Sequence, residues 1–221
     1  MPSPLGADPL IFFALESEAR PFRRLLPSPP PCRVVVTGMG PQNTRRALLT
    51  LQPLHQIPYV LTCGFAGALN PSFPLGAIVV EADENDALRQ PLLDTGATAG
   101  SFLLVDRIVA RAEHKQQLRT STGADAVEME SGIIREACRQ QGLPCAIVRV
   151  ISDIAAETLP LDFNQFLNRN GGIQFVRFAG ALIRHPAKVR DLLKFQSQLR
   201  QCARNLADFL SRLLVNPSLD R

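Results

Sequence analysis

The sequence predicts one α/β domain over residues 1–221, built on a largely parallel sheet. Short β-branched runs alternate along the chain with helix-like segments. The run CAIVRVIS at 145–152 is almost unbroken in its apolar character, which is typical of a strand covered on both faces. A chain of 221 residues, 46% of them hydrophobic, is also long enough to bury a sizeable core.

Strands and helices can be placed from their patterns. Because proline suits the first helical turn, one helix is expected to begin at Pro21 and another at Pro41. A third helix is expected after AVEMES and ends near Gly142, with Pro144 just beyond. The predicted strands lie at residues 10–15, 33–40, 59–69, 76–81, 101–105 and 145–152, with a rigid proline-rich loop at 27–31.

The last third of the sequence is expected to be helical. Between residues 188 and 214, valine, leucine and phenylalanine recur at spacings of three and four. This pattern predicts an apolar stripe that packs on the core. The basic residues on the other face leave a membrane-surface helix as an alternative.

Composition disfavours several other kinds of protein. No apolar run reaches the roughly 18–20 residues that span a bilayer, and the N-terminus lacks the basic region of a signal peptide, so we expect a cytoplasmic protein without an integral membrane segment. The net charge is +4, but there is no Trp, one Tyr and no nucleic-acid-binding motif, so nucleic acid is not an expected partner. The five cysteines form no C-x-x-C pair, which predicts buried free thiols and no metal site.

Acidic residues gather where predicted strands end. In open α/β sheets, ligands bind beyond the carboxyl ends of the strands. The first strand leads into Glu16 and Glu18, another ends in VEMES, and the strand after it ends in Ser152 and Asp153. These side chains are therefore expected to meet at one edge of the sheet.

Glycine-rich segments follow two other strands. TGMG contains Gly38 and Gly40, and CGFAG lies at 63–67. GMGPQN resembles the start of a dinucleotide loop, but Asn43 stands where the third glycine of G-x-G-x-x-G belongs, so a nicotinamide cofactor is not expected. These glycines can also serve only to permit tight turns.

The charged residues have structural interpretations as well. Acids suit the first turn of a helix, which accounts for Glu16 and Glu18 by themselves. Asp153 can cap a turn. Arg149, inside an apolar run, needs an anionic or carbonyl partner, and that partner can be purely structural.

The two glutamates of AVEMESG are expected to have different surroundings. Residues two apart share a face of a strand but diverge by about 200° on a helix. At a switch from strand to helix, Glu130 reaches the edge of the sheet. Glu128 lies further back, where a structural hydrogen-bonding role is expected.

Five motifs in this order, ALESEA, TGMG, CGFAGAL with LGAIVV, AVEMES and VRVISD, resemble the nucleoside phosphorylase and nucleosidase superfamily. The resemblance extends over roughly residues 10–155. It is greatest to the 5′-methylthioadenosine/S-adenosylhomocysteine nucleosidases and the hopanoid-associated nucleoside phosphorylases. It implies a three-layer αβα fold with a mixed, largely parallel sheet, cleavage of the N-glycosidic bond of a purine nucleoside, no cofactor, and a homo-oligomer with a dimer favoured.

The resemblance also implies a role for each matching residue. Glu18 falls on the glutamate that activates the attacking water, Glu130 on the glutamate that binds the ribose hydroxyls, and Asp153 on the acid that protonates N7 of the purine. Met129 falls on the methionine that packs against the sugar. The other matching positions line or support the site: Gly38, Gly40, Phe65, Ala66, Gly67, Val127, Glu128, Arg149 and Ser152.

Two departures from the family pattern bear on the substrate. Phe65 stands where the family usually has a small hydroxyl residue, so it can narrow the pocket, stack on a ligand or turn away. The segment 80–127 is much shorter than in the methylthioadenosine nucleosidases, and VDRIVA offers Ile108 where they place an aromatic over the purine. A more open site fits a bulky 5′ substituent, as in the hopanoid-associated relatives.

Water is expected to accept the ribosyl group, with phosphate as the alternative co-substrate. Phosphorylases of this superfamily hold phosphate with arginines on the first loop and after the third strand. TCGFAGA has no arginine, and Arg20, Arg23 and Arg24 follow Glu18 in a predicted helix. Phosphate stays open because Arg20 can turn inward. A non-catalytic nucleoside-binding protein is a further alternative, although the presence of all three acids argues against it.

Overall fold

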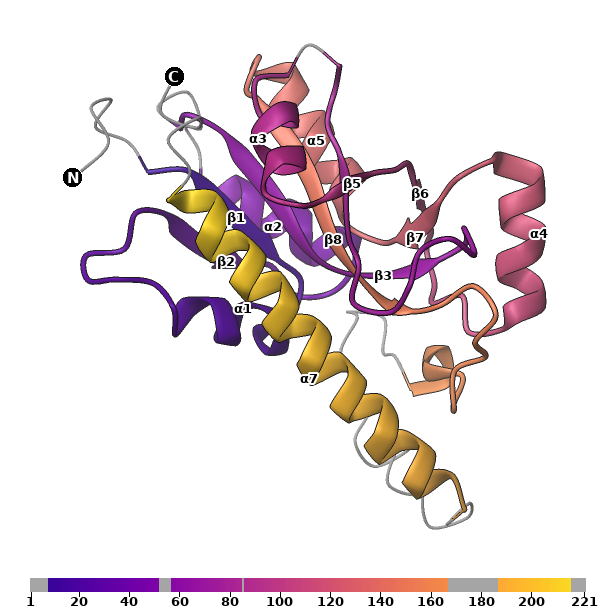
Figure 1. Ribbon diagram of the computed structural model, residues 1–221. Helices are drawn as coiled ribbons and strands as arrows, with labels where there is room; N and C mark the ends of the chain where they lie inside the picture. The colour runs from indigo at the N-terminus through magenta and orange to yellow at the C-terminus, as the bar shows by residue number, and fades with distance from the viewer. Residues whose placement is uncertain (1–7, 52–56, 85, 167–186, 216–221) are drawn as a thin grey trace.

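A mixed, mostly parallel β-sheet forms the centre of the molecule, with helices on both of its faces (Figure 1). The computed structural model describes residues 8–51, 57–84, 86–166 and 187–215. The predicted three-layer αβα class is confirmed. The main strand order is β2 (Arg33–Val36), β1 (Leu10–Phe13), β3 (Val60–Ala68), β8 (Cys145–Asp153), β4 (Ile78–Glu81) and β5 (Thr98–Ala99).

The two long strands β3 and β8 lie side by side in parallel at the centre of the sheet. Every residue of β8 after Cys145 is buried, as its apolar sequence predicts. The register between the two strands shifts at Ala66 and Gly67, and β3 then pairs with β7 (Ala126–Glu128), which in turn pairs with β6 (Phe102–Leu104). The CGFAG segment therefore lies inside a strand, and its interpretation as a turn after the strand is wrong.

The first helix, α1 (Glu16–Arg23), begins five residues before Pro21, so the predicted start is wrong. The Glu18 carboxylate accepts a 2.8 Å hydrogen bond from the backbone N–H of Leu15. This is one half of a capping box, and it starts the helix where the first strand ends. The starts and ends predicted from Pro41 and Gly142 are confirmed by α2 (Pro41–Thr50) and α5 (Ser131–Gln140).

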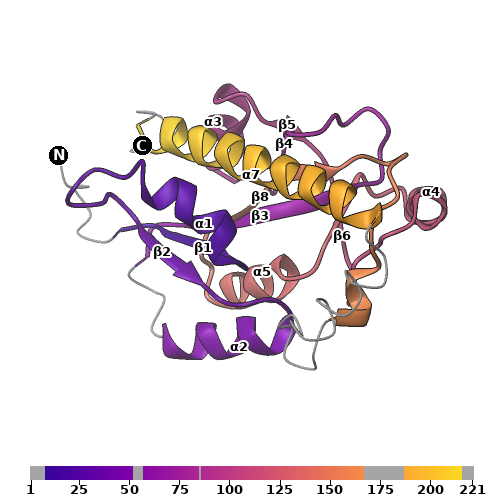
Figure 2. The ribbon, with the colours of Figure 1, turned by 90° about the horizontal axis from the view of Figure 1, so that it is seen from below.

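The helices cover the sheet in two layers (Figure 2). Helix α1 packs with α7 (Ala187–Leu214) over one face, and α2 packs with α5 over the other. The second half of α7 buries the predicted stripe, including Leu206, Phe209 and Leu210. In its first half Leu193 is 62% exposed, so the stripe is only partly used there. Residues 167–186 of the predicted helical third lie outside the described residues.

Three short elements escape the sequence patterns: α3 (Arg89–Asp94), α4 (Ala112–Thr122) and the 3₁₀ helix η1 (Phe163–Phe166). In α4 the one buried residue is Lys115, so the helix has no apolar stripe to signal it. The five cysteines are free thiols and four are buried, as predicted. Across the described ranges, no helix is long and apolar enough to cross a bilayer.

Candidate functional site

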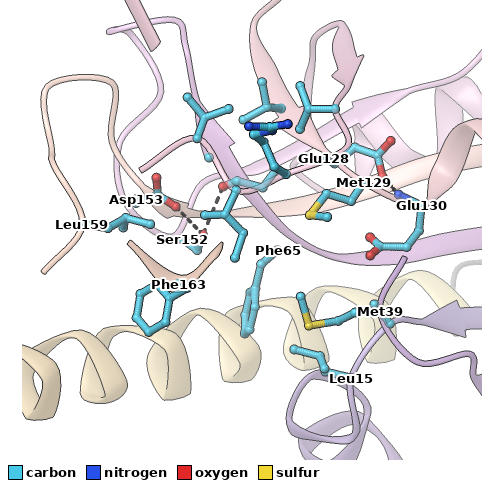
Figure 3. A pocket seen from close by; sticks show the side chains of 18 of the residues that line it. Leu15, Met39, Phe65, Glu128, Met129, Glu130, Ser152, Asp153, Leu159 and Phe163 are labelled. Carbon is cyan, nitrogen blue, oxygen red and sulfur yellow. Dashed lines mark hydrogen bonds between the residues drawn. The ribbon is translucent and has the colours of Figure 1, made fainter. Parts of the chain in front are cut away.

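A cavity of about 270 Å³ lies where β3, β7 and β8 meet the first turns of the helices (Figure 3). Asp153 and Ser152 lie at one end, Glu130 lies at the other, and Phe65 projects between them. The predicted residues that line the cavity are Glu18, Phe65, Ala66, Gly67, Val127, Glu128, Met129, Glu130, Ser152 and Asp153. Gly38, Gly40 and Arg149 do not line the cavity, so any effect they have on a ligand passes through neighbouring residues.

Glu18 is bonded to strand β3 and to the N-cap residue of its own helix α1. Its Oε1 accepts a 2.9 Å hydrogen bond from the N–H of Phe65 in β3, and its Oε2 accepts one from Leu15. The side chain is almost wholly buried, and this burial raises the pKa of Glu18 to about 7 against the opposing effects of the Phe65 bond and of Arg149. A carboxyl with that pKa exchanges protons readily near neutral pH.

Glu128, which lines the cavity, forms a buried ion pair with Arg149, which does not. Arg149 Nη2 donates to Glu128 Oε2 at 2.7 Å and to Ser131 Oγ at 2.9 Å. Glu128 Oε2 also accepts the N–H groups of Glu130 and Ser131, so it caps the N-terminus of α5. Burial acts to raise the pKa of Glu128, but the Arg149 guanidinium and the Ser131 hydrogen bonds outweigh it and lower that pKa. The pKa of Glu128 is thus lowered, and its Oε2 is engaged by three donors of the protein.

Glu130 has a different environment only two residues away. Its Oε1 accepts a 3.1 Å hydrogen bond from the N–H of Gly40, at the start of α2, and the half-buried side chain lines the cavity. Burial raises the pKa of Glu130, against the effects of Arg149 and of the Gly40 bond. Gly40 has φ of 86°, a left-handed conformation that glycine adopts without strain. The divergence predicted for Glu128 and Glu130 is thus seen in their contacts.

Asp153 closes the other end of the cavity with both carboxylate oxygens occupied. Oδ1 accepts a 2.7 Å hydrogen bond from the hydroxyl of Ser152, and Oδ2 accepts one of 2.5 Å from Nζ of Lys115. Lys115 has no exposed surface. It was missed in the sequence, because a lysine in a polar helix gives no sign that it is buried.

Two glycines of β3 let these acids approach the strand. A Cβ atom on Gly64 would lie 2.8 Å from Glu18 Oε1 and 3.1 Å from Arg149 Nη1. A Cβ on Gly67 would lie 3.0 Å from Asp153 Oδ2. The glycines in CGFAG are thus required by close approach and not by a turn.

Aromatic and aliphatic side chains complete the cavity wall. Phe65 lines the cavity, and so do Phe163 of η1 and Phe195 of α7, whose rings stack with centroids 5.7 Å apart. Phe163 supplies an aromatic although Ile108 stands where the resemblance placed one. These contributions from the C-terminal part were not predicted, since η1 and α7 show no link to the site in the sequence. The other apolar residues in the lining are Leu15, Met39, Val105, Ile108, Val109, Leu159 and Leu199.

Cationic groups are scarce in the cavity. Among the described residues Arg107 is the one arginine or lysine in the lining, and it is exposed and paired with Asp106. Arg23 is engaged by Glu16 on the surface of α1, and Arg20 is exposed. The described ranges contain no group of three or more His, Cys, Asp or Glu side chains that could hold a metal ion.

Comparison with known protein families places the chain in one of them. The sequence matches the Phosphorylase superfamily over residues 28–97 and 81–214. The chain belongs to the Phosphorylase superfamily. Within this superfamily it is 30% identical over 122 residues to an aminodeoxyfutalosine nucleosidase of Helicobacter pylori strain J99, which covers 53% of this chain and 46% of that protein. It is 25% identical over 173 residues to a 5′-methylthioadenosine/S-adenosylhomocysteine nucleosidase of Colwellia psychrerythraea, covering 61% of this chain and 71% of that one. The chain thus matches about half the length of the H. pylori relative.

Solved structures share the fold over nearly the whole chain. The futalosine hydrolase of H. pylori strain 26695 superposes with a TM-score of 0.68 at 17% identity, covering 95% of this chain and 97% of that one. The C. psychrerythraea nucleosidase in complex with adenine gives a TM-score of 0.68 at 19% identity, with 94% of each chain covered. At these identities the likeness establishes the fold.

Proposed function

We propose that this protein hydrolyses the N-glycosidic bond of a purine nucleoside and releases the base. One observation carries the proposal: three carboxyl groups with different surroundings, those of Glu18, Glu130 and Asp153, face one cavity. Breaking this bond builds positive charge on the ribose and negative charge on the departing base. In a cavity with acids at both ends, a carboxylate can stabilise the positive charge on the ribose and an acid can protonate the departing base.

Glu18 activates the attacking water in this proposal. A general base works best when its pKa lies near the working pH, and burial raises the pKa of Glu18 to about 7. The hydrogen bonds from Leu15 and Phe65 hold the carboxyl in one place. Glu18 then accepts a proton from water as the water oxygen attacks C1′ of the ribose.

Glu130 binds the ribose. A carboxylate has two acceptor oxygens, which match the 2′- and 3′-hydroxyls of a ribose. The N–H of Gly40 donates a hydrogen bond to Oε1 and so orients the Glu130 carboxylate. Met129, the preceding residue, lines the cavity and packs against one face of the sugar. Glu128, Arg149 and Gly38 support this end, while Val127, Ala66 and Gly67 form the adjoining wall.

Asp153 acts on the base. It lies at the end of the cavity opposite Glu130, where a purine would reach it (Figure 3). Protonation of N7 removes the negative charge that builds on the leaving base, and general acid help of this kind contributes typically 10²–10⁴-fold. Ser152 orients the carboxyl through its 2.7 Å hydrogen bond.

Water is favoured over phosphate as the ribosyl acceptor. A phosphate site needs cations or free backbone N–H groups beside the reacting carbon. The lining holds one exposed arginine among the described residues, and Arg149, which does not line the cavity, directs its Nη2 at Glu128. Phosphorolysis is therefore the second candidate and an outcome of the test below.

Adenine is the favoured base, because the similar proteins are named for aminodeoxyfutalosine, 5′-methylthioadenosine and S-adenosylhomocysteine, and one was solved with adenine. The apolar side chains that α7 adds to the lining, Phe195 and Leu199, support a substrate with an apolar 5′ substituent. We propose further that residues 1–221 act as one domain, without a cofactor, as a homodimer. Five free thiols support a reducing compartment such as the cytoplasm.

Product analysis tests the reaction. The full chain is incubated with adenosine, 5′-methylthioadenosine, S-adenosylhomocysteine and inosine, each with and without phosphate, and bases and sugars are separated by chromatography. Adenine and a free ribose product without phosphate are expected. Release that requires phosphate and yields a ribose 1-phosphate would establish phosphorolysis. Adenine binding without release under either condition would establish a binding protein.

A further inference from the structure

We propose that Lys115 supplies, through Asp153, the proton that the leaving purine takes up. This inference rests on the proposed function and adds a residue to it. Lys115 lies on α4, a helix that otherwise contributes nothing to the cavity, and its side chain has no exposed surface. A lysine is almost never fully buried without a partner or a task.

The ammonium group of Lys115 is held by three acceptors around the end of β8. Nζ donates to Asp153 Oδ2 at 2.5 Å, to the carbonyl oxygen of Ile154 at 2.8 Å and to that of Glu157 at 3.0 Å. Asp153 lines the cavity and Lys115 does not, so the carboxyl stands between the ammonium group and the cavity. A proton leaving Lys115 toward the cavity therefore meets Asp153 first.

The contacts of Asp153 point to Lys115 as its proton source. Both oxygens of Asp153 accept hydrogen bonds, one from Ser152 and one from Lys115. The ammonium group of Lys115 directs an N–H at Oδ2 of the carboxyl that faces the cavity, so it is the neighbouring group placed to supply a proton through Asp153.

Substrate binding provides the reason for the transfer. A nucleoside that fills the cavity removes water from Asp153, and a buried ion pair in a dry site loses the solvation that favours its charges. Movement of one proton from Nζ to Oδ2 converts the pair into a neutral amine and a carboxylic acid. As the C1′–N9 bond breaks and its electron pair moves into the base, the acid O–H bond breaks and N7 takes the proton. Asp153 is again a carboxylate, and Lys115 regains a proton from water once the base has left.

The test compares two substrates whose leaving groups differ. One is the adenine nucleoside that the wild-type chain cleaves fastest, and the other is p-nitrophenyl β-D-ribofuranoside, whose leaving group departs without a proton. In Lys115→Met we expect kcat for the adenine nucleoside to fall at least 100-fold, and the loss on the nitrophenyl riboside to be at least tenfold smaller. Lys194→Met, an exposed lysine on α7, is the matched control and should retain both activities.

A second variant, Lys115→Arg, distinguishes a role of Lys115 as proton donor from a role of its positive charge alone. Arginine keeps the positive charge but cannot release its proton in a protein, so Lys115→Arg should lose adenine release as Lys115→Met does. If Lys115→Arg retains adenine release, Lys115 acts only as a charge and the inference is wrong. Equal losses on both substrates, in either variant, would show a structural role and would also overturn it.

A double variant covers the case in which an unpaired Asp153 carboxylate prevents folding. Lys115→Met combined with Asp153→Asn removes both charges. If Lys115 acts through Asp153, this variant should release adenine at the rate of Asp153→Asn alone, within about threefold. A further loss of tenfold or more would contradict the inference. A wild-type chain inactive on both substrates would instead refute the proposed function.

Discussion

Arg149 Nη2 lies 2.7 Å from Glu128 Oε2, and both side chains are almost wholly buried. The pair connects the centre of β8 to the end of β7 and to the N-terminus of α5. Glu18 and Glu130, the two acids that face the ribose in the proposed function, both lie within the electrostatic influence of the same guanidinium. One buried cation therefore organises three carboxyl groups.

Glu128→Gln should lower stability more than turnover. Loss of the carboxylate leaves Arg149 buried without its counter-ion, which costs about 3 kcal/mol in the free energy of unfolding. Urea denaturation measures this cost. Glu136→Gln, an exposed glutamate of α5 paired with Arg139, is the matched control and should leave the unfolding midpoint almost unchanged. A normal midpoint with abolished turnover would show that Glu128 binds the substrate directly.

The rate of base release should depend on pH through Glu18. Burial raises the pKa of Glu18 to about 7, and a general base must be ionised to accept a proton from water. We therefore expect kcat/KM to fall about tenfold for each pH unit below about 7 and to level off above it. Initial rates of adenine release across this range provide the measurement. A flat profile down to about pH 5 would exclude Glu18 as the base.

Glu18 should give folding stability the opposite pH dependence, so that stability falls over the pH range in which activity rises. Because the pKa of Glu18 is higher in the folded chain than its ordinary value of 4.5, protonation favours the folded state. This contribution is complete below about pH 4.5 and is lost as the pH rises through about 7. Relative to Glu18→Gln, the wild type should lose about 3 kcal/mol of unfolding free energy between about pH 4 and pH 8. Urea denaturation of both chains across this range checks it, and parallel curves would contradict it.

Asp153→Asn should abolish most base release while the fold persists. The amide cannot donate an acidic proton to N7, so kcat for a purine nucleoside should fall 10²–10⁴-fold. Circular dichroism and the affinity for adenine show whether the variant is folded. Ser152→Ala, which removes the hydrogen bonds from Oγ to Asp153 Oδ1 and to the carbonyl oxygen of Ala66, should lose less than Asp153→Asn. If Asp153→Asn retains wild-type turnover, the base leaves without help from this end of the cavity.

Gly64→Ala should displace Glu18. The added methyl group would meet Glu18 Oε1 at 2.8 Å and Arg149 Nη1 at 3.1 Å, so the carboxyl must move away from the N–H of Phe65. We expect kcat to fall at least tenfold and stability to fall by about 1–3 kcal/mol. Gly123→Ala is a control for kcat alone: it ends α4 away from the cavity, but its φ of 72° strains any residue with a Cβ atom, so its stability should fall as well. The measurement is kcat per folded molecule for Gly64→Ala and Gly123→Ala, and equal values would refute the prediction.

The order of strands and helices could be predicted because local patterns carry it. The apolar run of β8, Pro41 at the start of α2 and Gly142 after α5 are local signals, and each is confirmed. Local signals failed where the cause lies in a distant contact. Gly64 and Gly67 look like turn residues in the sequence, yet they lie inside strand β3. Glycine is needed at both positions because Glu18 and Asp153 pack closely against the strand there.

By itself the sequence determined the α/β class, the buried strands and a set of acids at strand ends. Its motifs also pointed to Glu18, Glu130 and Asp153 as residues of one cavity. Glu18 follows β1 and Asp153 ends β8, and these strands run parallel and end at one edge of the sheet. Glu130 follows β7, which runs antiparallel to β3, so its place in the cavity was decided by the tertiary structure. Only the tertiary structure decided what surrounds each acid: Arg149 beside Glu128, Lys115 beside Asp153, and the aromatic wall from η1 and α7. The reason is physical, because burial and the position of charges depend on elements distant in the chain, and a polar helix such as α4 does not show which of its side chains is buried.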